Sequence, residues 1–153
     1  MKNRYTAGFL GLFLVCCIVT KAQEPIPVKQ QIIDKPFLFS QLPDRSDCIT
    51  EELIQLFQAA PSSGIAIHLP GNLVLRGVIT EKLQRSPGIT SINIKLSNYP
   101  GALFNISLNT ETGSTAKIKG RIIHPQSGDV LILTEDHSTY YLKKQLQKFF
   151  MTE

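Results

Sequence analysis

Apolar and polar residues alternate along the chain from Gly64 onward, in a series of short runs. Apart from Gly77 and Gly120, apolar side chains occupy every second position in residues 65–69, 73–79, 92–96, 104–108 and 116–122, and a further apolar run covers 130–134. A period of two places apolar side chains on one face of a β-strand and polar side chains on the other. This part of the chain therefore predicts several half-buried strands.

Turn-forming residues separate these runs. Pro70-Gly71, the stretch from Asn98 to Gly101 and the stretch from Pro125 to Gly128 each lie between two runs. Proline and glycine supply the backbone angles that tight turns need, so consecutive strands are expected to pair as antiparallel hairpins. Gly77 interrupts the second run, and we expect a β-bulge there.

The end of the chain is ambiguous in period. Tyr140, Tyr141 and Leu142 suit a strand, whereas residues 141–150 also place apolar side chains at helical spacing. We favour a strand at the tyrosines, and the pattern leaves the state of residues 141–150 open.

One helix is predicted before the strands. Its apolar face consists of Ile49, Leu53, Leu56, Phe57 and Ala60. Asp47 is suited to cap the first turn, the acidic residues of that turn favour the helix dipole, and Pro61 ends the helix. We therefore expect a helix that begins near Asp47.

These elements predict an α+β domain that is mostly β, an antiparallel meander with one N-terminal helix. A sheet with one apolar face must hide that face, either by curling into a small, partly open barrel or by packing against the helix. We assign residues 41–153 to this single β-rich domain, a common domain size. Residues 23–40 contain three prolines in a mostly polar background and predict an extended lead-in.

The first 22 residues have the pattern of a secretory signal peptide. Lys2 and Arg4 precede an apolar run over residues 7–19, and small residues stand at positions −3 and −1 before an expected cleavage site after Ala22. The run is shorter than the roughly 20 residues that span a bilayer. A lipoprotein signal is the alternative, because Cys16 and Cys17 lie in the run, but no small residue precedes them. We expect a periplasmic or extracellular protein without a transmembrane segment.

Removal of residues 1–22 leaves a nearly neutral chain. Three of the 16 basic residues lie in this segment and none of the 12 acidic residues does. The basic character of the full sequence therefore gives no general attraction to nucleic acid, and no nucleic-acid partner is expected. Of the three cysteines only Cys48 remains, which excludes an intramolecular disulfide and leaves either a reactive thiol near a helix start or a small core residue.

The clearest candidate for a binding surface is the polar side of residues 117–121. Lys117, Lys119 and Arg121 project together, and Arg76 and Lys95 are expected to join them from neighbouring strands. Such a surface can bind an anion, so the expected partners are an acidic glycan or an envelope protein. The alternative is a solvated face whose charges prevent edge pairing.

Enzymatic motifs are weak by comparison. The three histidines lack the spacing of a metal pair, and no nucleophile elbow is present, so we predict no catalytic residue, metal or cofactor. The main alternative is a small secreted hydrolase with a site built from His124 and Asp129 on loops. A helix followed by strands is also superficially similar to an Sm-type RNA-binding barrel, against which export and the near-neutral charge argue.

Four short segments resemble parts of small exported proteins of Bacteroidota that have no known activity. They are Thr20-Lys21-Ala22-Gln23, the stretch from Leu96 to Phe104, Gly120-Arg121-Ile122-Ile123 and Tyr141-Leu142-Lys143-Lys144. The resemblance implies a location in or outside a Gram-negative envelope. Taken with the other patterns, we expect an exported, non-enzymatic binding or accessory module of the cell envelope, with its ligand and oligomeric state open.

Overall fold

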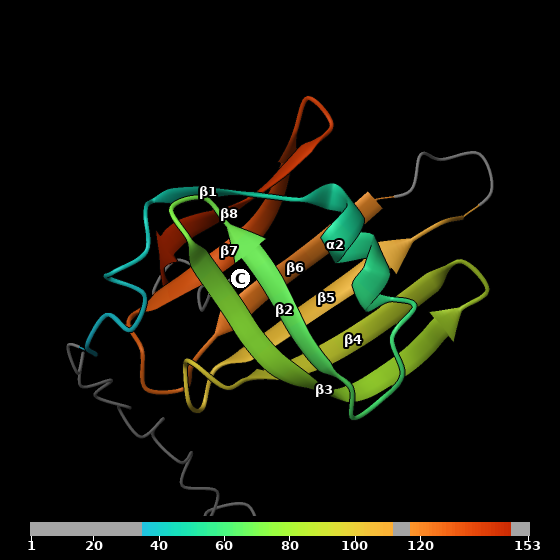
Figure 1. Ribbon diagram of the computed structural model, residues 1–153, viewed down its shortest axis with the longest axis horizontal. Coiled ribbons are helices and arrows are strands. Elements are labelled where there is room, and N and C mark those ends of the chain that lie inside the picture. Colours follow the sequence, from blue (N-terminus) through green and yellow to red (C-terminus); the bar gives the residue numbers. More distant parts are fainter. Residues whose placement is uncertain (1–34, 112–116, 148–153) are drawn as a thin grey trace, which may run out of the picture. The chain divides into compact units, whose positions relative to one another are not determined.

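Eight β-strands and one short α-helix make up the part of the chain that the computed structural model describes, residues 35–111 and 117–147. The strands are β1 (Arg45–Cys48), β2 (Gly64–Leu69), β3 (Leu73–Ser86), β4 (Ile89–Leu96), β5 (Leu103–Asn109), β6 (Lys117–Ile123), β7 (Asp129–Asp136) and β8 (Thr139–Leu146). The helix, α2 (Thr50–Leu56), follows β1 and lies beside β2 (Figure 1). The expected signal peptide, residues 1–22, and lead-in residues 23–34 fall outside the described residues.

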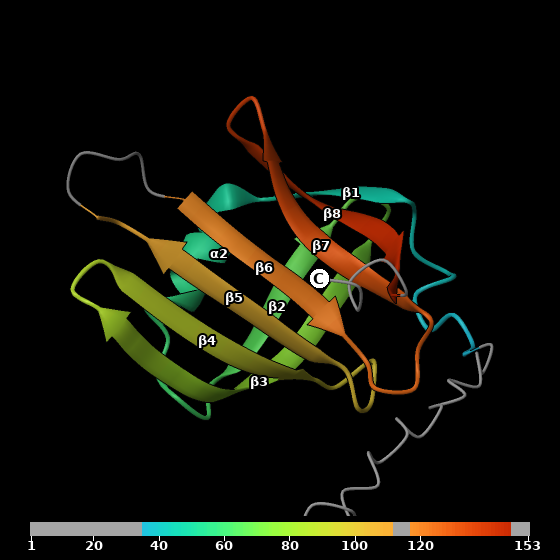
Figure 2. The same ribbon diagram turned by 180° about the vertical axis from the view of Figure 1, so that it is seen from behind.

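The strands form one antiparallel sheet in the order β1-β8-β7-β6-β5-β4-β3-β2. Its two edge strands, β1 and β2, approach each other without being hydrogen-bonded neighbours, so the sheet is a nearly closed barrel. Figure 2 shows β4, β5 and β6 side by side, with α2 and β2 behind them. The predicted fold, a mostly β antiparallel meander with a single short helix, is confirmed.

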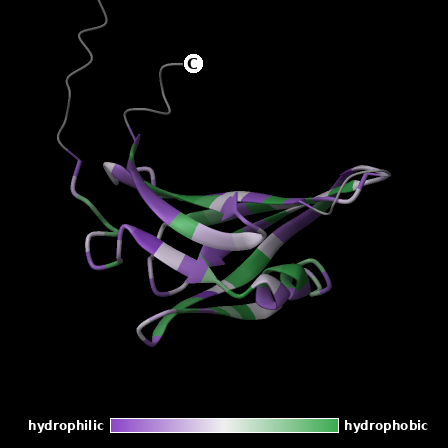
Figure 3. Ribbon diagram, turned by 90° about the horizontal axis from the view of Figure 1, so that it is seen from above, coloured by the Kyte–Doolittle hydropathy of each residue, from purple (hydrophilic) through white to green (hydrophobic). Residues whose placement is uncertain are grey.

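The core lies on the inner face of this curled sheet. The largest fully buried side chains include Ile67, Leu75, Ile94, Phe104 and Ile122, one from each of β2 to β6. Buried residues alternate with exposed or half-buried ones along these strands, as the period of two predicts. Figure 3 shows the corresponding alternation of apolar and polar residues along the ribbons.

The helix begins later than the sequence predicts. Asp47 is not its cap, because residues 45–48 form β1, which pairs with β8 with Arg45 opposite Lys143. The Asp47 carboxylate instead accepts a hydrogen bond from Arg45 Nε at 3.1 Å, and Ile49 precedes the helix without a side-chain cap. The predicted apolar face is correct in its middle, where Leu53, Leu56 and Phe57 are buried, but wrong at its ends, where Ile49 and Ala60 are exposed.

The bulges in β3 also differ from the prediction. Gly77 pairs regularly with Ile65 and Leu96, and the register shifts lie between Ile79 and Glu81 and between Gln84 and Ser86. A Cβ atom on Gly77 would lie 2.6 Å from the carbonyl oxygen of Lys95 on β4. Glycine is therefore required at this position by the close approach of the neighbouring backbone rather than by a bulge.

The residues before β1 are fastened to the start of β7. Asp129 is 2% exposed, and its two carboxylate oxygens accept hydrogen bonds from the backbone N–H groups of Leu38 and Phe39, each at 3.0 Å. The Ser127 hydroxyl also donates to this carboxylate. Phe39 is fully buried and lies 5.4 Å from the ring of Tyr99. Asp129 thus fixes a segment that is distant in sequence against the sheet.

The strand prediction for the end of the chain is confirmed as far as the description extends. Tyr140 and Leu142 in β8 are buried, and Lys143, which follows Leu142, is exposed. Phe149 and Phe150, which supported the helical alternative, fall outside the described residues.

Candidate binding surface

The cations of β6 point away from the core. Ile118 and Ile122 are 4% and 0% exposed, respectively, and the side chains on either side of them in the strand alternate to the opposite face. The side chains of Lys117, Lys119 and Arg121 are all exposed. The period of two that predicted this arrangement therefore places these three charges in a line along the outside of one strand.

A row of neutral polar side chains runs beside this line. Lys117 lies opposite Asn109, Lys119 opposite Ser107, and Arg121 opposite Asn105 in the β5–β6 register. Directly opposed residues of an antiparallel pair share one face, with Cβ atoms about 5 Å apart. Each cation therefore has a carboxamide or hydroxyl group as its neighbour on β5.

Hydrogen bonds extend this polar surface to β3. The Asn105 carboxamide donates to Asn93 Oδ1 at 2.6 Å, and Asn93 in turn donates to the Glu81 carboxylate at 2.6 Å. Because Asn93 holds Glu81 two strands away from β5, the carboxylate does not reach Arg121. The hydroxyls of Ser91 and Ser107 make no hydrogen bond to another residue in the described part of the chain, so they are free to contact a ligand.

None of the three β6 cations forms an ion pair with an acidic residue within residues 35–111 and 117–147. The ion pairs found there join Arg45, His68, His137 and Lys144 to acidic neighbours. Three like charges on alternate positions of one strand repel one another, and no acidic residue in that part lies within ion-pair distance of them. This surface is therefore suited to receive negative charge from outside.

Lys143 on β8 belongs to the same surface. The register places Arg121 opposite Ile132 on β7 and Ile132 opposite Lys143, so all three share the outer face. Lys143 is exposed and has no ion-pair partner among the residues that the structure describes. We call the four residues Lys117, Lys119, Arg121 and Lys143 the basic strip. The sequence did not suggest Lys143, because the state of residues 141–150 was open; once β8 is a strand, its alternation with buried Leu142 identifies it.

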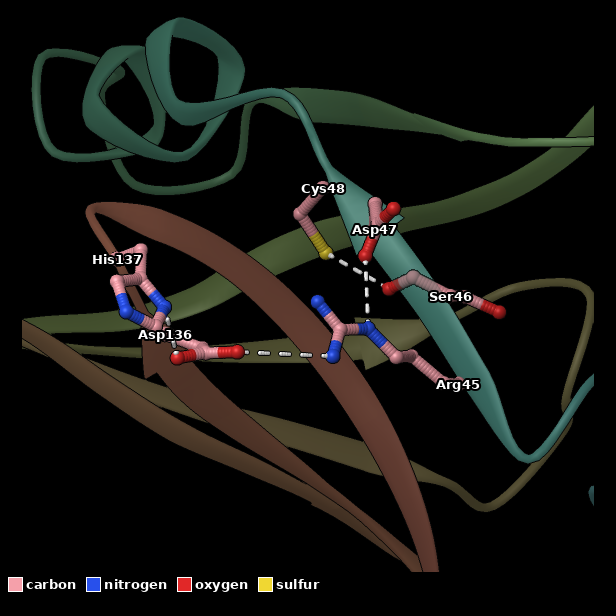
Figure 4. A network of polar contacts seen from close by, with 6 residues as sticks. All are labelled: Arg45, Ser46, Asp47, Cys48, Asp136 and His137. Atoms are coloured by element: carbon pink, nitrogen blue, oxygen red, sulfur yellow. Dashed lines mark hydrogen bonds and ion pairs between the residues drawn. The ribbon is translucent and has the colours of Figure 1, made fainter.

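Arg45 extends the row beyond Lys143 but differs in its contacts. Its guanidinium lies 3.8 Å from the ring centroid of Tyr141 and pairs with Asp47 at 3.1 Å and Asp136 at 3.8 Å (Figure 4). Asp136 also contacts His137 at 2.7 Å. The charge of Arg45 is thus compensated locally, and we leave it outside the basic strip.

The structure does not bring Arg76 and Lys95 next to the β6 cations. Lys95 lies opposite Leu103 on β5, so its own row meets β6 at Ile123 rather than at a cation. With strands about 4.8 Å apart, Lys95 is on the order of 10 Å from β6 across the sheet. Arg76 lies farther still, on β3 beside the turn that begins at Ser97. Both are exposed, so three of the five predicted residues form one cluster and two lie apart from it.

The residues of the hydrolase alternative make separate contacts. His124 Nδ1 accepts a hydrogen bond from the backbone N–H of Gln126 at 3.1 Å, while the carboxylate of Asp129 is taken up by Leu38, Phe39 and Ser127. No ion pair joins His124 to Asp129. Among the described residues, no group of three or more histidine, cysteine or acidic side chains is placed to hold a metal ion.

Cys48 is a buried thiol of the core, 7% exposed. Burial is the main cause that raises the pKa of the Cys48 thiol to about 11. A backbone hydrogen bond from Leu142 lowers this pKa, and the nearby carboxylates of Asp47 and Glu52 raise it further. Its Sγ donates to the carbonyl oxygen of Ser46 at 3.8 Å (Figure 4). The thiol is therefore protonated at neutral pH. An open hollow of about 330 Å³ beside it has mostly apolar walls.

The chain matches no known protein family, no curated protein and no solved structure. In the part of the chain that the structure describes, no helix combines the length and the apolar character needed to cross a bilayer.

Proposed function

We propose that this protein is an exported, non-enzymatic binding module of the cell envelope that contacts an acidic partner through the basic strip. The expectation of export rests on the signal-peptide pattern of residues 1–22. The observation that supports the binding role is the alternation of exposed cations with buried isoleucines along β6, without an acidic partner for those cations among the described residues.

The strip costs the fold some electrostatic repulsion and contributes nothing to the core. A merely solvated surface usually intersperses charges of both signs. Here the neighbouring β5 positions are neutral, and Glu81, the nearest acid along the Arg121 row, is held by Asn93. A binding role accounts for this segregation of positive charge.

A matched pair of arginine variants tests the proposal. Arg121 and Arg85 are both exposed residues within strands, and neither forms an ion pair in the described part of the chain. We expect R121Q to elute from an immobilised anionic polymer, such as dextran sulfate, at lower salt than the unaltered protein. R85Q removes the same charge from β3 and should elute as the unaltered protein does.

The magnitude should be modest for one residue, because an exposed ion pair changes affinity only about two- to fivefold. The triple variant K117Q/K119Q/R121Q should therefore lose most of its retention. Equal elution of R121Q and R85Q, or unaltered retention of the triple variant, would refute a role for the strip. Circular dichroism of each variant establishes that the sheet is intact.

A further inference from the structure

We infer that the acidic partner of the basic strip is a linear acidic polysaccharide, with its carboxylates on the cations and its hydroxyl groups on the neutral row of β5. This inference rests on the proposed function and specifies its ligand. It is drawn from the chemistry of the side chains that surround the cations and from their register.

The cations recur at a regular interval. Alternate residues of a strand lie about 6.6 Å apart, so Lys117, Lys119 and Arg121 span on the order of 13 Å in a straight line. An extended polymer that carries a negative charge on each unit can contact successive cations without bending. Lys143, on the order of 10 Å to the side of Arg121 across β7, gives a second point of contact.

The residues beside the cations suit sugar hydroxyls. Asn105, Ser107 and Asn109 lie opposite the three cations, and Ser91 lies opposite Ser107 on the next strand. Hydroxyl and carboxamide groups both donate and accept hydrogen bonds, which matches the mixed donors and acceptors of a sugar ring. The hydroxyl groups of Ser91 and Ser107, which have no hydrogen-bond partner among the described residues, are the clearest candidates to bond to a sugar.

The same surface fits an acidic protein less well. Stable protein interfaces are centred on buried aromatic or large aliphatic anchors. Within the described residues, the outward positions of β4, β5 and β6 carry no aromatic side chain, and their aliphatic residues are at least half-buried. On β8 the outward ring of Tyr141 is covered by the Arg45 guanidinium, 3.8 Å from the ring centroid. Single-stranded nucleic acid is disfavoured for the same reason, because its bases stack on aromatic rings.

The experiment compares four probes on the purified protein by fluorescence anisotropy. They are an oligomer of galacturonic acid, the same oligomer with its carboxylates methyl-esterified, an oligomer of glutamic acid and an oligothymidylate. We expect the galacturonate oligomer to bind most tightly and its ester to lose binding, because the ester has the same hydroxyls without the charge.

Two variants separate charge from hydroxyl contacts. R121Q should weaken binding of galacturonate and glutamate oligomers alike, by about two- to fivefold. S107A removes a hydroxyl that has no partner in the described structure, so it should weaken galacturonate binding and leave glutamate binding unchanged. R85Q is the charge-matched control for the first variant.

The outcomes distinguish the two proposals. If the glutamate oligomer binds as tightly as galacturonate and S107A affects neither, the polysaccharide inference is overturned while the proposed function stands. Tighter binding of oligothymidylate would also overturn the inference. If none of the anionic probes binds, or binding is insensitive to R121Q, both proposals fail.

Discussion

Replacing Asp129 with asparagine would keep the shape of a buried side chain and remove its charge. The carboxylate accepts hydrogen bonds from the backbone N–H groups of Leu38 and Phe39, at 3.0 Å each, and from the Ser127 hydroxyl. Asparagine has only one acceptor oxygen, so its amino group must face one of the two backbone donors. Either donor then loses a hydrogen bond to a charged group at a site where Asp129 is 2% exposed. The Phe39 N–H would be left without an acceptor, whereas the Leu38 N–H would keep only the Ser127 hydroxyl, at 3.1 Å.

The expected loss follows from these contacts. A hydrogen bond to a charged group contributes about 1.5–3 kcal/mol, and an unsatisfied buried donor costs a similar amount. We therefore expect D129N to lower the free energy of unfolding by about 2–3 kcal/mol. With a urea dependence of about 1–3 kcal/mol per molar, the unfolding midpoint should fall by about 0.7–3 M. Circular dichroism is the suitable signal, because the chain has no tryptophan.

Two variants serve as controls for D129N. S127A removes a neutral donor to the same carboxylate and the hydroxyl that accepts from the Leu38 N–H at 3.1 Å, and it should cost about 1–2 kcal/mol. D136N changes an exposed aspartate whose ion pairs with Arg45 and His137 lie at the surface, and it should change the free energy of unfolding by less than about 1 kcal/mol. A midpoint for D129N equal to that of D136N would show that the fastening of residues 38 and 39 does not stabilise the fold.

Three further changes test other contacts by urea unfolding. Y140F should cost about 1–3 kcal/mol, because the Tyr140 hydroxyl accepts a hydrogen bond at 3.0 Å from the buried backbone N–H of Ile118. G77A should cost about 1–3 kcal/mol, since the added methyl group would meet the backbone of β4 at 2.6 Å. Burial favours a raised pKa for Glu52, but hydrogen bonds from the backbone and ring of His68, and the histidine charge, lower it overall. The contact between Glu52 and His68 therefore contributes its full stability above the unfolded-state pKa of the Glu52 carboxyl group, and this stability is lost as the pH falls through the lower folded-state pKa. E52Q should lack this contribution at every pH.

Each of these predictions has an outcome that contradicts it. An unchanged midpoint for Y140F would mean that water satisfies Ile118. A stable G77A would mean that β3 and β4 can separate locally. If E52Q and the unaltered protein lost stability in parallel as the solution is acidified, the contact with His68 would not be the source of the pH dependence.

The hairpins could be predicted because the sequence features that determine them lie within short segments of the chain. Alternating residues and a turn of a few positions determine three pairs, β2 with β3, β4 with β5 and β6 with β7. The outward side of Lys117, Lys119 and Arg121 follows from the same alternation. Residues 80–86, which are polar apart from Leu83, show no alternation in the sequence. They extend β3 by pairing with the first residues of β4.

The pairing of β1 with β8 could not be predicted in this way. Residues 45–48 show no strand pattern of their own, and Asp47 next to a helical run favours a cap by every local rule. Their partner lies near the other end of the chain. The charge balance of the basic strip likewise depends on register, because only the alignment of β4 with β3 shows that Asn93 holds Glu81.

The order of strands in the sheet has a consequence for how the chain folds. Every neighbouring pair except β1 and β8 is consecutive in sequence, so each of these pairs can form as soon as its second strand is free to fold. The four residues of β1 are synthesised first, yet they have no strand to join until residue 146 has emerged. Completion of the sheet must therefore wait until β8 is available, and a truncated chain that lacks β8 would leave its first strand without a place to dock.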